Sequence, residues 1–271
     1  MKFRLLETGC ISSRQGVCLK RMEPEVTVIT VVFNGRRKIE ETITSVASQE
    51  GVNVEHVVID GGSTDGTVEA IKKHARDIAF WTSEPDRGIY DAMNKGVAHA
   101  RGEWVLFLGC GDAFASNDVV AECMQAARQY SLRKQRPAVA LIFGDVRYDT
   151  GLVFRSSMGW RLLLRNTVHH QGAFYHRSLF DSFRYNIEHR LMADYELNLL
   201  IYRRRLPVLQ LDKIISICEA GGRSAALSNR WRSIDELNAI RKQYVAPPIN
   251  LFMSGVLFAK TVVRMNVLRS R

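Results

Sequence analysis

The chain has 271 residues, of which 46% are apolar, so it can bury the core of one large domain with a small extension. Its formal charge of +10 and pI near 9.6 favour an anionic partner: nucleic acid, a phosphorylated substrate or an acidic membrane surface. Five scattered cysteines without a CxxC pair exclude a zinc-finger pattern and indicate reduced thiols. The N-terminal stretch MKFRLLETGCISSRQG lacks the apolar run of roughly 7 to 15 residues that a signal peptide needs, so we expect a cytoplasmic protein.

Strands and helices are predicted to alternate over residues 23–150. Short β-branched or aromatic runs without polar alternation predict strands at residues 26–33, 56–60, 80–81, 104–108 and 139–143. Apolar residues at helical spacing predict three helices between these strands: one with Ile39, Ile43 and Val46, one with Val68, Ile71 and Ile78, and one with Ile89, Met93, Val97 and Ala100. A fourth helix is predicted from an N-cap at Asn117 to about Tyr130. This alternation predicts an α/β fold with a mostly parallel, Rossmann-like sheet flanked by helices.

The pattern is mixed after residue 150. It predicts a helix over Leu191–Tyr202, a strand over Val208–Ile217 and a second helix over Ser228–Tyr244. We therefore divide the chain into an N-terminal extension, 1–22, a large domain, 23–246, with halves 23–150 and 151–246, and a C-terminal segment, 247–271.

The C-terminal segment combines apolar and basic residues. Eleven uncharged, mostly apolar positions precede Lys260, fewer than the roughly 20 that a membrane-spanning helix needs. We expect a helix lying on anionic lipid, where its apolar residues Phe252, Leu257 and Phe258 enter the surface and Lys260, Arg264, Arg269 and Arg271 meet headgroups. The alternative is a terminal helix packed on the domain or on a dimer partner.

Polar residues follow three of the predicted strands. Asn34 and Gly35 follow the first, residues 60–65 follow the second, and residues 109–112 follow the strand WVLFL. Because ligands bind at the carboxyl edge of a parallel sheet, we expect these residues to meet along one edge.

The stretch DGGSTDGT offers a carboxylate, Asp60, to a base N–H or a ribose hydroxyl, with glycines that allow close backbone approach. The alternative is that Asp65 or Ser63 only caps a helix while the glycines only turn the chain. The next stretch, SEPDRGIYDAMNKG, places Arg87 where it suits a diphosphate, although an Arg in such a turn is also commonly structural. In FLGCGD, Asp112 follows a buried strand, where one carboxylate can bind Mg²⁺ with substrate phosphates as further ligands.

Together these stretches resemble family 2 glycosyltransferases of the GT-A fold, in particular bacterial enzymes that build exopolysaccharide or lipopolysaccharide repeat units. The resemblance is carried by TVITVVFNG, QEGVNVEHVVIDGGSTDGT, SEPDRGIYDAMNKG and GEWVLFLGCGD, which cover about residues 26–113 in the family's order. It implies a GT-A catalytic domain over 23–246, with a nucleotide-sugar half, an acceptor half and a C-terminal helical extension.

The resemblance also implies which residues bind the donor. Asp60 would lie near the nucleobase, and Arg87 and its neighbours near the ribose or diphosphate. The implied donor-binding set is Phe33, Asn34, Asp60, Gly61, Ser63, Asp65, Asp86, Arg87, Asn94 and Lys95.

The implied cofactor is a divalent cation, Mg²⁺ or Mn²⁺, bound by Asp112. Many relatives carry several acidic residues in a DxD motif at this point. Here Gly109, Cys110 and Gly111 leave Asp112 alone, as in a subgroup with an L-N-x-G-D type motif.

The second half resembles the family's acceptor side through HHQGAFYHRSLF and LMADYELNLL. On this mapping Asp194 is the catalytic base, and His170, Gln171 and Arg223 line the sugar pocket. Inverting transfer needs a base because the acceptor hydroxyl must lose its proton as it attacks the anomeric carbon. The alternative for Asp194 is a stabilising charge at a helix N-terminus, worth about 0.3 to 1 kcal/mol.

The leading interpretation is an inverting glycosyltransferase that moves sugar from a nucleotide-sugar donor, a UDP-sugar, to a lipid-linked oligosaccharide in bacterial surface polysaccharide synthesis. It would lie on the inner face of the cell membrane, with no nucleic-acid partner. One alternative is a degenerate GT-A domain that binds nucleotide without transferring sugar. Another is a basic nucleic-acid-binding module, which would leave the strand-end carboxylates without a role.

Overall fold

The computed structural model describes residues 23–134, 139–221 and 229–257. Its strands are β1 (Val26–Val32), β2 (Val54–Asp60), β3 (Phe80–Ser83), β4 (Trp104–Phe107), β5 (Ala113–Phe114), β6 (Leu141–Tyr148), β7 (Val153–Phe154), β8 (Ala173–His176) and β9 (Val208–Cys218). Its α-helices are α1 (Ile39–Ala47), α2 (Thr67–Lys73), α3 (Ile89–His99), α4 (Val119–Lys134), α5 (Ala193–Arg203) and α6 (Arg230–Tyr244).

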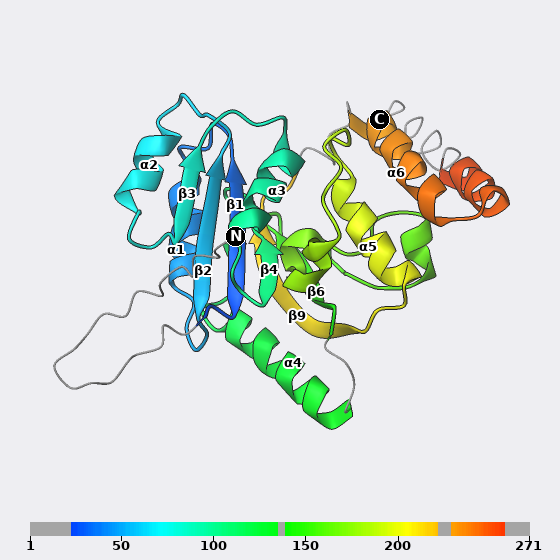
Figure 1. The fold of residues 1–271 in the computed structure, drawn as a ribbon, viewed down its shortest axis with the longest axis horizontal. Coiled ribbons are helices and arrows are strands. Elements are labelled where there is room, and N and C mark those ends of the chain that lie inside the picture. Colours follow the sequence, from blue (N-terminus) through cyan, green and yellow to red (C-terminus); the bar gives the residue numbers. More distant parts are fainter. Residues whose placement is uncertain (1–22, 135–138, 222–228, 258–271) are drawn as a thin grey trace, which may run out of the picture.

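The described strands form one sheet in the order β3-β2-β1-β4-β8-β6-β9-β5, with β7 paired to β6. The four strands β3, β2, β1 and β4 are parallel, as the alternation of strands and helices predicts. The remainder is mixed, because β8 runs antiparallel to both β4 and β6. Figure 1 shows the parallel part beside the half that carries α5 and α6.

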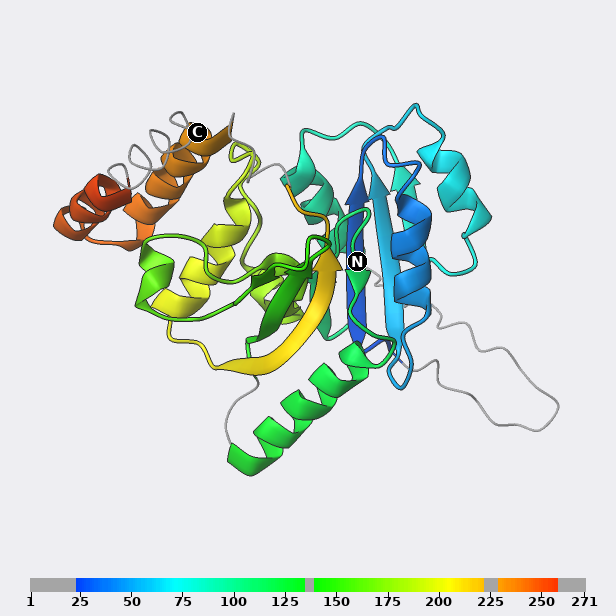
Figure 2. The same cartoon turned by 180° about the vertical axis from the view of Figure 1, so that it is seen from behind.

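Helices cover both faces of the sheet because successive strand residues point to opposite faces. On one face, Met93 and Val97 of α3 and Leu197 of α5 pack on Ile29 and Phe107. On the other face, the apolar side chains of α1, α2 and α4 pack on alternate residues of β1, β2 and β4. Figure 2 shows α1 and α4 from that side.

The parallel register brings the carboxyl ends of β1 and β2 to the same edge of the sheet. Val32 pairs with Asp60, and Asp60 pairs with Ser83 of β3. Residues that follow these strands are therefore neighbours in space, as expected from the sequence.

Several boundaries differ from prediction by a few residues, and two of these differences concern residues named in the sequence analysis, Ile78 and Asn117. Helix α2 ends at Lys73, and Ile78 instead lies buried in the turn before β3, where it packs with α1 and α2. Helix α4 begins at Val119, after Asp118, so Asn117 does not directly precede it. Asn117 instead accepts hydrogen bonds from the Ser48 hydroxyl at 3.3 Å and from the Glu50 N–H at 2.8 Å, which tie its loop to the end of α1.

The described part of the C-terminal segment is helical over residues 247–257 and packs beside α6. Arg241 of α6 is fully buried, and its guanidinium donates to Asn250 at 2.6 Å and Ser254 at 2.8 Å. Leu251 and Phe252 of this helix are exposed. The predicted lipid contact Leu257 instead packs against buried side chains of α5 and α6, so that prediction is wrong. The predicted headgroup contacts, Lys260, Arg264, Arg269 and Arg271, and the predicted apolar contact Phe258 lie outside the described residues.

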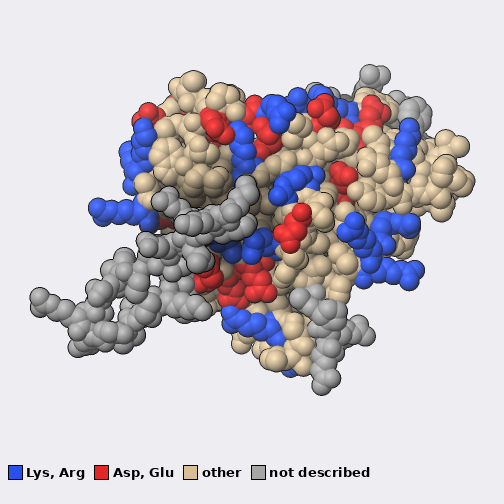
Figure 3. Space-filling view, viewed as in Figure 1, with Lys and Arg blue, Asp and Glu red and all other residues tan. Residues whose placement is uncertain are grey.

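No helix within the described ranges is long and apolar enough to cross a membrane. On the face shown in Figure 3, Lys and Arg side chains lie in several separate groups with acidic side chains among them.

Candidate active site

A cleft of about 1680 Å³ lies beyond the carboxyl ends of β1 and β4 and extends to the segment before α5 and to α6. Nine of the predicted site residues line it: Phe33, Asn34, Gly61, Asp86, Arg87, Asp112, His170, Gln171 and Asp194. Five others do not: Asp60, Ser63, Asp65, Asn94 and Lys95. Arg223 lies outside the described residues. The cleft therefore brings the predicted metal, donor and acceptor residues of the two halves together.

Asp60 organises the turn that follows β2. Its carboxylate is fully buried and accepts hydrogen bonds from the N–H groups of Gly62 at 3.1 Å and Ser63 at 2.9 Å. It also accepts from the hydroxyls of Ser63 at 2.5 Å and Ser83 at 2.6 Å. In this arrangement the carboxylate shapes the backbone of the turn after β2, and its predicted contact with the nucleobase stays a prediction.

The turns after β1 and β2 are joined through short polar side chains. The Ser63 hydroxyl accepts from the Asn34 N–H at 2.7 Å, and the Asn34 side chain accepts from the Thr64 N–H at 3.0 Å. Asn34 has φ 53°, a left-handed conformation that asparagine tolerates better than most residues. Asp65 accepts from the Arg36 N–H at 3.1 Å and from the Thr67 N–H at 3.1 Å, so it links the turn after β1 to the first residue of α2.

The loop before α3 presents Asp86 and Arg87 to the cleft. Asp86 accepts from the Gly88 N–H at 2.8 Å, while the exposed Arg87 guanidinium reaches Asp91 at 3.4 Å. Asn94 and Lys95, on α3 itself, make other contacts. Asn94 exchanges two hydrogen bonds with the backbone of Tyr185, and Lys95 binds Glu84 at 2.8 Å.

Asp112 lies at the cleft wall, 5% exposed. Its Oδ1 accepts from the Glu219 N–H at 3.0 Å, and its Oδ2 accepts from the Gln171 amide. Burial raises the pKa of this carboxyl to about 6, against the opposing effects of the Glu219 N–H and His170. A Cβ at Gly109 would collide with Oδ2, so glycine there leaves the carboxylate room.

This carboxylate fits a sparsely ligated divalent cation. Oδ2 has a second lone pair beyond the Gln171 contact, and carboxylate oxygen is the ligand that Mg²⁺ and Mn²⁺ prefer. Among the described residues, no group of three or more His, Cys, Asp or Glu side chains is placed to hold a metal. A cation at Asp112 would therefore take most of its other ligands from donor phosphates and water.

Asp194 lies at the start of α5 and is 8% exposed. Its Oδ1 accepts from the Tyr90 hydroxyl at 3.0 Å, and its Oδ2 accepts from the Asn166 amide at 2.7 Å. Nδ1 of His170 lies 3.4 Å from Oδ2. Burial opposes ionisation, but the contacts with His170 and Tyr90 outweigh it and hold the pKa of Asp194 below its ordinary value.

Several residues that shape this site escape prediction. Tyr90 and Asn166 bind Asp194, and the guanidinium of Arg190 donates to the backbone oxygen of Arg87 in the loop before α3. Glu236, buried in α6, accepts three backbone N–H groups just before α5, at 2.8 to 3.0 Å. Tyr90 lies within the motif GIYDAMNKG, so the sequence offered a signal for it. Asn166 and Glu236 lie in segments whose sequence has no pattern that indicates a functional residue.

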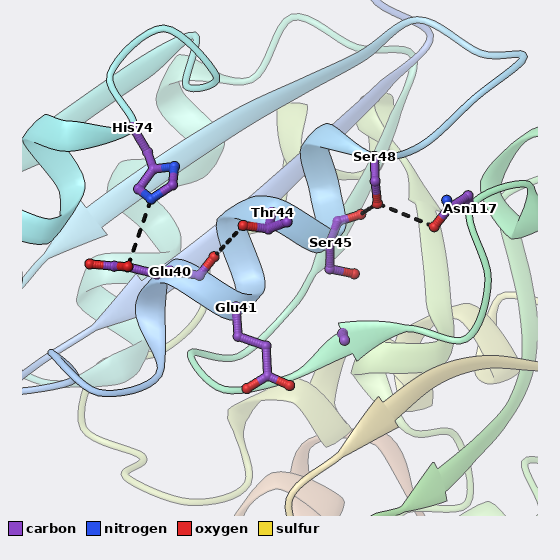
Figure 4. Close-up of a pocket in the computed structure, with 8 residues that line it drawn as sticks. Glu40, Glu41, Thr44, Ser45, Ser48, His74 and Asn117 are labelled. Atoms are coloured by element: carbon purple, nitrogen blue, oxygen red, sulfur yellow. Dashed lines mark hydrogen bonds and ion pairs between the residues drawn. The ribbon is translucent and has the colours of Figure 1, made fainter.

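A second, shallower hollow of about 450 Å³ lies along the outer side of α1. It is lined by Glu40, Glu41, Thr44, Ser45, Ser48, His74, Ala113 and Asn117. Figure 4 shows that several of these side chains bind their neighbours, as when Thr44 donates to the Glu40 backbone at 2.8 Å. None of the predicted site residues lies there.

The chain is similar to known glycosyltransferases in sequence and in fold. The family described as Glycosyl transferase family 2 matches residues 27–182. A PGL/p-HBAD biosynthesis glycosyltransferase of Mycobacterium bovis is 29% identical over 220 residues, 76% of this chain and 82% of that protein. An uncharacterized glycosyltransferase of Mycobacterium tuberculosis is 45% identical over 104 residues, 38% of this chain, and the match spans only 40% of that relative's length.

Two solved structures share the fold. S. aureus TarS 1–349 in complex with UDP-GlcNAc has a TM-score of 0.63 at 17% identity, over 86% of this chain and 71% of that one. The mannosyltransferase PcManGT from Pyrobaculum calidifontis, in complex with GDP-Man and Mn²⁺, has a TM-score of 0.58 at 20% identity, over 90% of this chain and 76% of that one. The fold is therefore GT-A, and since the family match covers more than half of the sequence, the chain belongs to glycosyl transferase family 2.

Proposed function

We propose that this protein transfers a sugar from a nucleotide-sugar donor to a hydroxyl acceptor with inversion at the anomeric carbon. The observation that carries this proposal is the single cleft lined by both Asp112 and the Asp194–His170 pair. Inverting transfer requires a group that stabilises the departing diphosphate and a base that removes the acceptor proton. Both kinds of group are present in one cavity.

The donor is proposed to lie along the β1 edge. Phe33, 65% exposed at the cleft, offers a ring on which a nucleobase can stack. Gly61 lies against Asp86, where an added Cβ would collide with the carboxylate, so glycine lets Asp86 lie close to this turn at the cleft. The exposed guanidinium of Arg87 would place a positive charge beside the diphosphate. The complex of TarS with UDP-GlcNAc favours a UDP-sugar, and that of PcManGT with GDP-Man makes a GDP-sugar the alternative.

A divalent cation held by Asp112 would neutralise the charge that develops on the departing diphosphate. Asp112 is kept in place by the Glu219 N–H and the Gln171 amide. The protein's own contribution at this wall is thus to orient one carboxylate toward the donor phosphates.

The acceptor is proposed to be a lipid-linked oligosaccharide at the inner face of the cell membrane, in surface polysaccharide synthesis. The side chains of Leu251 and Phe252 are 76% and 72% exposed on the terminal helix, and they would enter the lipid surface. The +10 charge of the chain favours an anionic membrane.

A screen of nucleotide sugars tests the donor. UDP-, GDP- and dTDP-sugars are added with and without Mn²⁺, and the melting temperature is measured, because a ligand that binds the native state raises it. We expect one nucleotide class to raise it only with Mn²⁺. Incubation with a bacterial lipid extract then tests transfer. Metal-dependent binding without any transfer would favour a nucleotide-binding domain that has lost activity.

The membrane proposal calls for a variant that spares the packing of the terminal helix. Deleting residues from 247 onward would also remove Asn250 and Ser254 from the buried Arg241 and so destabilise α6. The double variant Leu251→Ser, Phe252→Ser keeps those contacts. We expect it to lose binding to phosphatidylglycerol vesicles, while Leu132→Ser, another exposed leucine, on α4, retains it. Equal binding by both variants would refute the lipid contact.

A further inference from the structure

Tyr148, the last residue of β6, lines the cleft and is close to the Asp112 carboxylate. It is paired with Cys218 of β9, whose thiol lies beside that carboxylate. The next residue, Glu219, donates its N–H to Asp112 at 3.0 Å. The end of β6 and the end of β9 therefore meet at the wall where we propose that the donor diphosphate binds.

The ring of Tyr148 also leads to the other carboxylate of the cleft, Asp194. It meets the His169 ring edge-on, with centroids 6.0 Å apart, and the His169 ring stacks on that of His170 at 5.5 Å. Nδ1 of His170 lies 3.4 Å from Asp194. A series of neighbouring groups thus connects Asp112 to Asp194 along the cleft wall, and Tyr148 stands in the middle of it.

The backbone that carries this ring is fixed by hydrogen bonds. In the turn from β6 to β7, the Tyr148 N–H donates to the Leu152 oxygen at 2.8 Å, and the Tyr148 oxygen accepts from the Gly151 N–H at 2.9 Å. Gly151 has φ 84°, a left-handed conformation that glycine adopts without strain. The Asp149 N–H donates to the Cys218 oxygen at 2.9 Å. Tyr148 is therefore presented to the cleft from a closed hairpin.

The Tyr148 side chain is half-buried, and no group in the described part of the chain hydrogen bonds to its hydroxyl. Burial, and after it the nearby Cys218 and Asp112, raises the pKa of Tyr148 above its ordinary value, so the phenol stays protonated near pH 7. Burial lowers the pKa of His169 to about 3, so that ring is neutral as well. This stretch of wall offers uncharged rings and a hydroxyl that can donate or accept, which suits a sugar ring better than a phosphate.

We propose that Tyr148 binds the sugar that is transferred, through a hydrogen bond between its hydroxyl and a hydroxyl group of that sugar. This rests on the proposed function. During transfer the anomeric carbon must lie between a diphosphate at Asp112 and an acceptor hydroxyl at Asp194. The sugar ring attached to that carbon then lies along the wall that Tyr148 forms, whereas the nucleoside diphosphate does not need this contact.

Titration calorimetry tests the contact without an acceptor. The full-length protein, with Mn²⁺, is titrated with UDP, GDP and dTDP, and with UDP-glucose, UDP-galactose, UDP-N-acetylglucosamine, GDP-mannose and dTDP-glucose. The variant Tyr148→Phe keeps the ring and its contact with His169 and loses only the hydroxyl. We expect it to bind the nucleotide sugar about 2- to 12-fold more weakly, the effect of one hydrogen bond, and to bind the matching nucleoside diphosphate within about twofold of wild type.

The matched control is Tyr202→Phe. Tyr202 is also half-buried, but it lies on α5 and does not line the cleft. Its variant loses the same hydroxyl at a place where no sugar is proposed to bind. We therefore expect it to bind nucleotide sugars and nucleoside diphosphates as the wild type does.

Two results would overturn the assignment of Tyr148. One is a Tyr148→Phe variant that binds nucleotide sugars as tightly as the wild type. The other is a loss for the nucleoside diphosphate that equals or exceeds the loss for the nucleotide sugar, because the contact would then not be with the sugar. If the wild-type protein binds none of these nucleotide sugars, the proposed function itself fails, and the assignment of Tyr148 fails with it.

Discussion

The two sides of the cleft, proposed to bind the donor and the acceptor, use their carboxylates in different ways. On the donor side, Asp60 and Asp65 bind groups from the turns that follow β1 and β2 and the end of β3, and neither lines the cleft. On the acceptor side, Asp194 binds Tyr90 and Asn166, which lie 104 and 28 residues away in the sequence. The first side is held by contacts among turns at the ends of neighbouring strands, and the second by contacts of α5 with α3 and with the loop that contains Asn166.

The carboxylates therefore have two different roles: some hold the backbone in place, and others present a negative charge to the cleft. The carboxylate oxygens of Asp60 accept hydrogen bonds from four protein groups. A ligand in the cleft would therefore contact Gly61 and its neighbours rather than Asp60. Asp112 and Asp194 instead lie in the cavity wall. The sharpest tests therefore ask whether substitutions on the two sides change stability or activity.

The largest effect is expected from Asp194→Asn. The carboxamide is uncharged and cannot help to remove the acceptor proton, so turnover should fall at least about 100-fold. UDP binding, measured by calorimetry, should stay within a few-fold of wild type because Asp194 lies on the acceptor side. Normal turnover in this variant would remove Asp194 from the mechanism.

Asp60→Asn should act on stability. Its fully buried carboxylate would lose charge-assisted hydrogen bonds, and the free energy of unfolding in urea should fall by roughly 1.5 to 3 kcal/mol. Asp86→Asn is the matched control, because Asp86 faces the cleft and has one hydrogen bond, from Gly88. Similar stability losses in both variants would argue against a special scaffolding role for Asp60.

The variant Glu236→Gln tests whether Glu236 stabilises the segment that leads into α5. Glu236 accepts the N–H groups of Arg190, Leu191 and Met192, which lead into the helix that carries Asp194. We expect a loss of about 1 to 2 kcal/mol in unfolding free energy and lower kcat. Asp235→Asn, exposed on the same helix, should change neither. An unaltered kcat in Glu236→Gln would show that these hydrogen bonds do not affect catalysis.

The pH dependence of metal binding should be the mildest effect. Burial raises the pKa of Asp112 to about 6, above its ordinary value, so the carboxyl takes up a proton as the pH falls below 6. Mn²⁺-dependent UDP binding should drop about tenfold between pH 7 and pH 5. The stability of the metal-free protein should change in the opposite direction. Above pH 6 the buried charge of Asp112 lowers the free energy of unfolding, and protonation between pH 6 and 4 removes this loss. Metal-dependent binding that is unchanged at pH 5 would contradict this.

The sequence predicts the parallel sheet and the position of Asp112 because both follow from short-range patterns. Apolar runs define the strands, and polar residues directly after β1, β2 and β4 must meet at one edge. The same reasoning does not place Asn94 and Lys95, since the direction of a side chain on α3 depends on what packs against it. Asn94 meets the backbone of Tyr185, 91 residues away.

The acceptor side is less predictable for the same reason. The resemblance identifies Asp194 and His170, but only the fold shows that they touch and that Asn166 completes the group. Glu236 reaches the start of α5 from a helix more than forty residues later in the sequence. No local spacing encodes such contacts, because loops of irregular structure bring them together.

The central claim is that one cleft binds a nucleotide sugar through a cation at Asp112. Calorimetric titration of UDP into the wild-type protein and into Asp112→Asn, each with Mn²⁺ and with EDTA, tests it most directly. The account predicts binding by the wild type that needs Mn²⁺ and is lost or strongly weakened in Asp112→Asn. Equal binding by both proteins in Mn²⁺, or binding by neither, would contradict it.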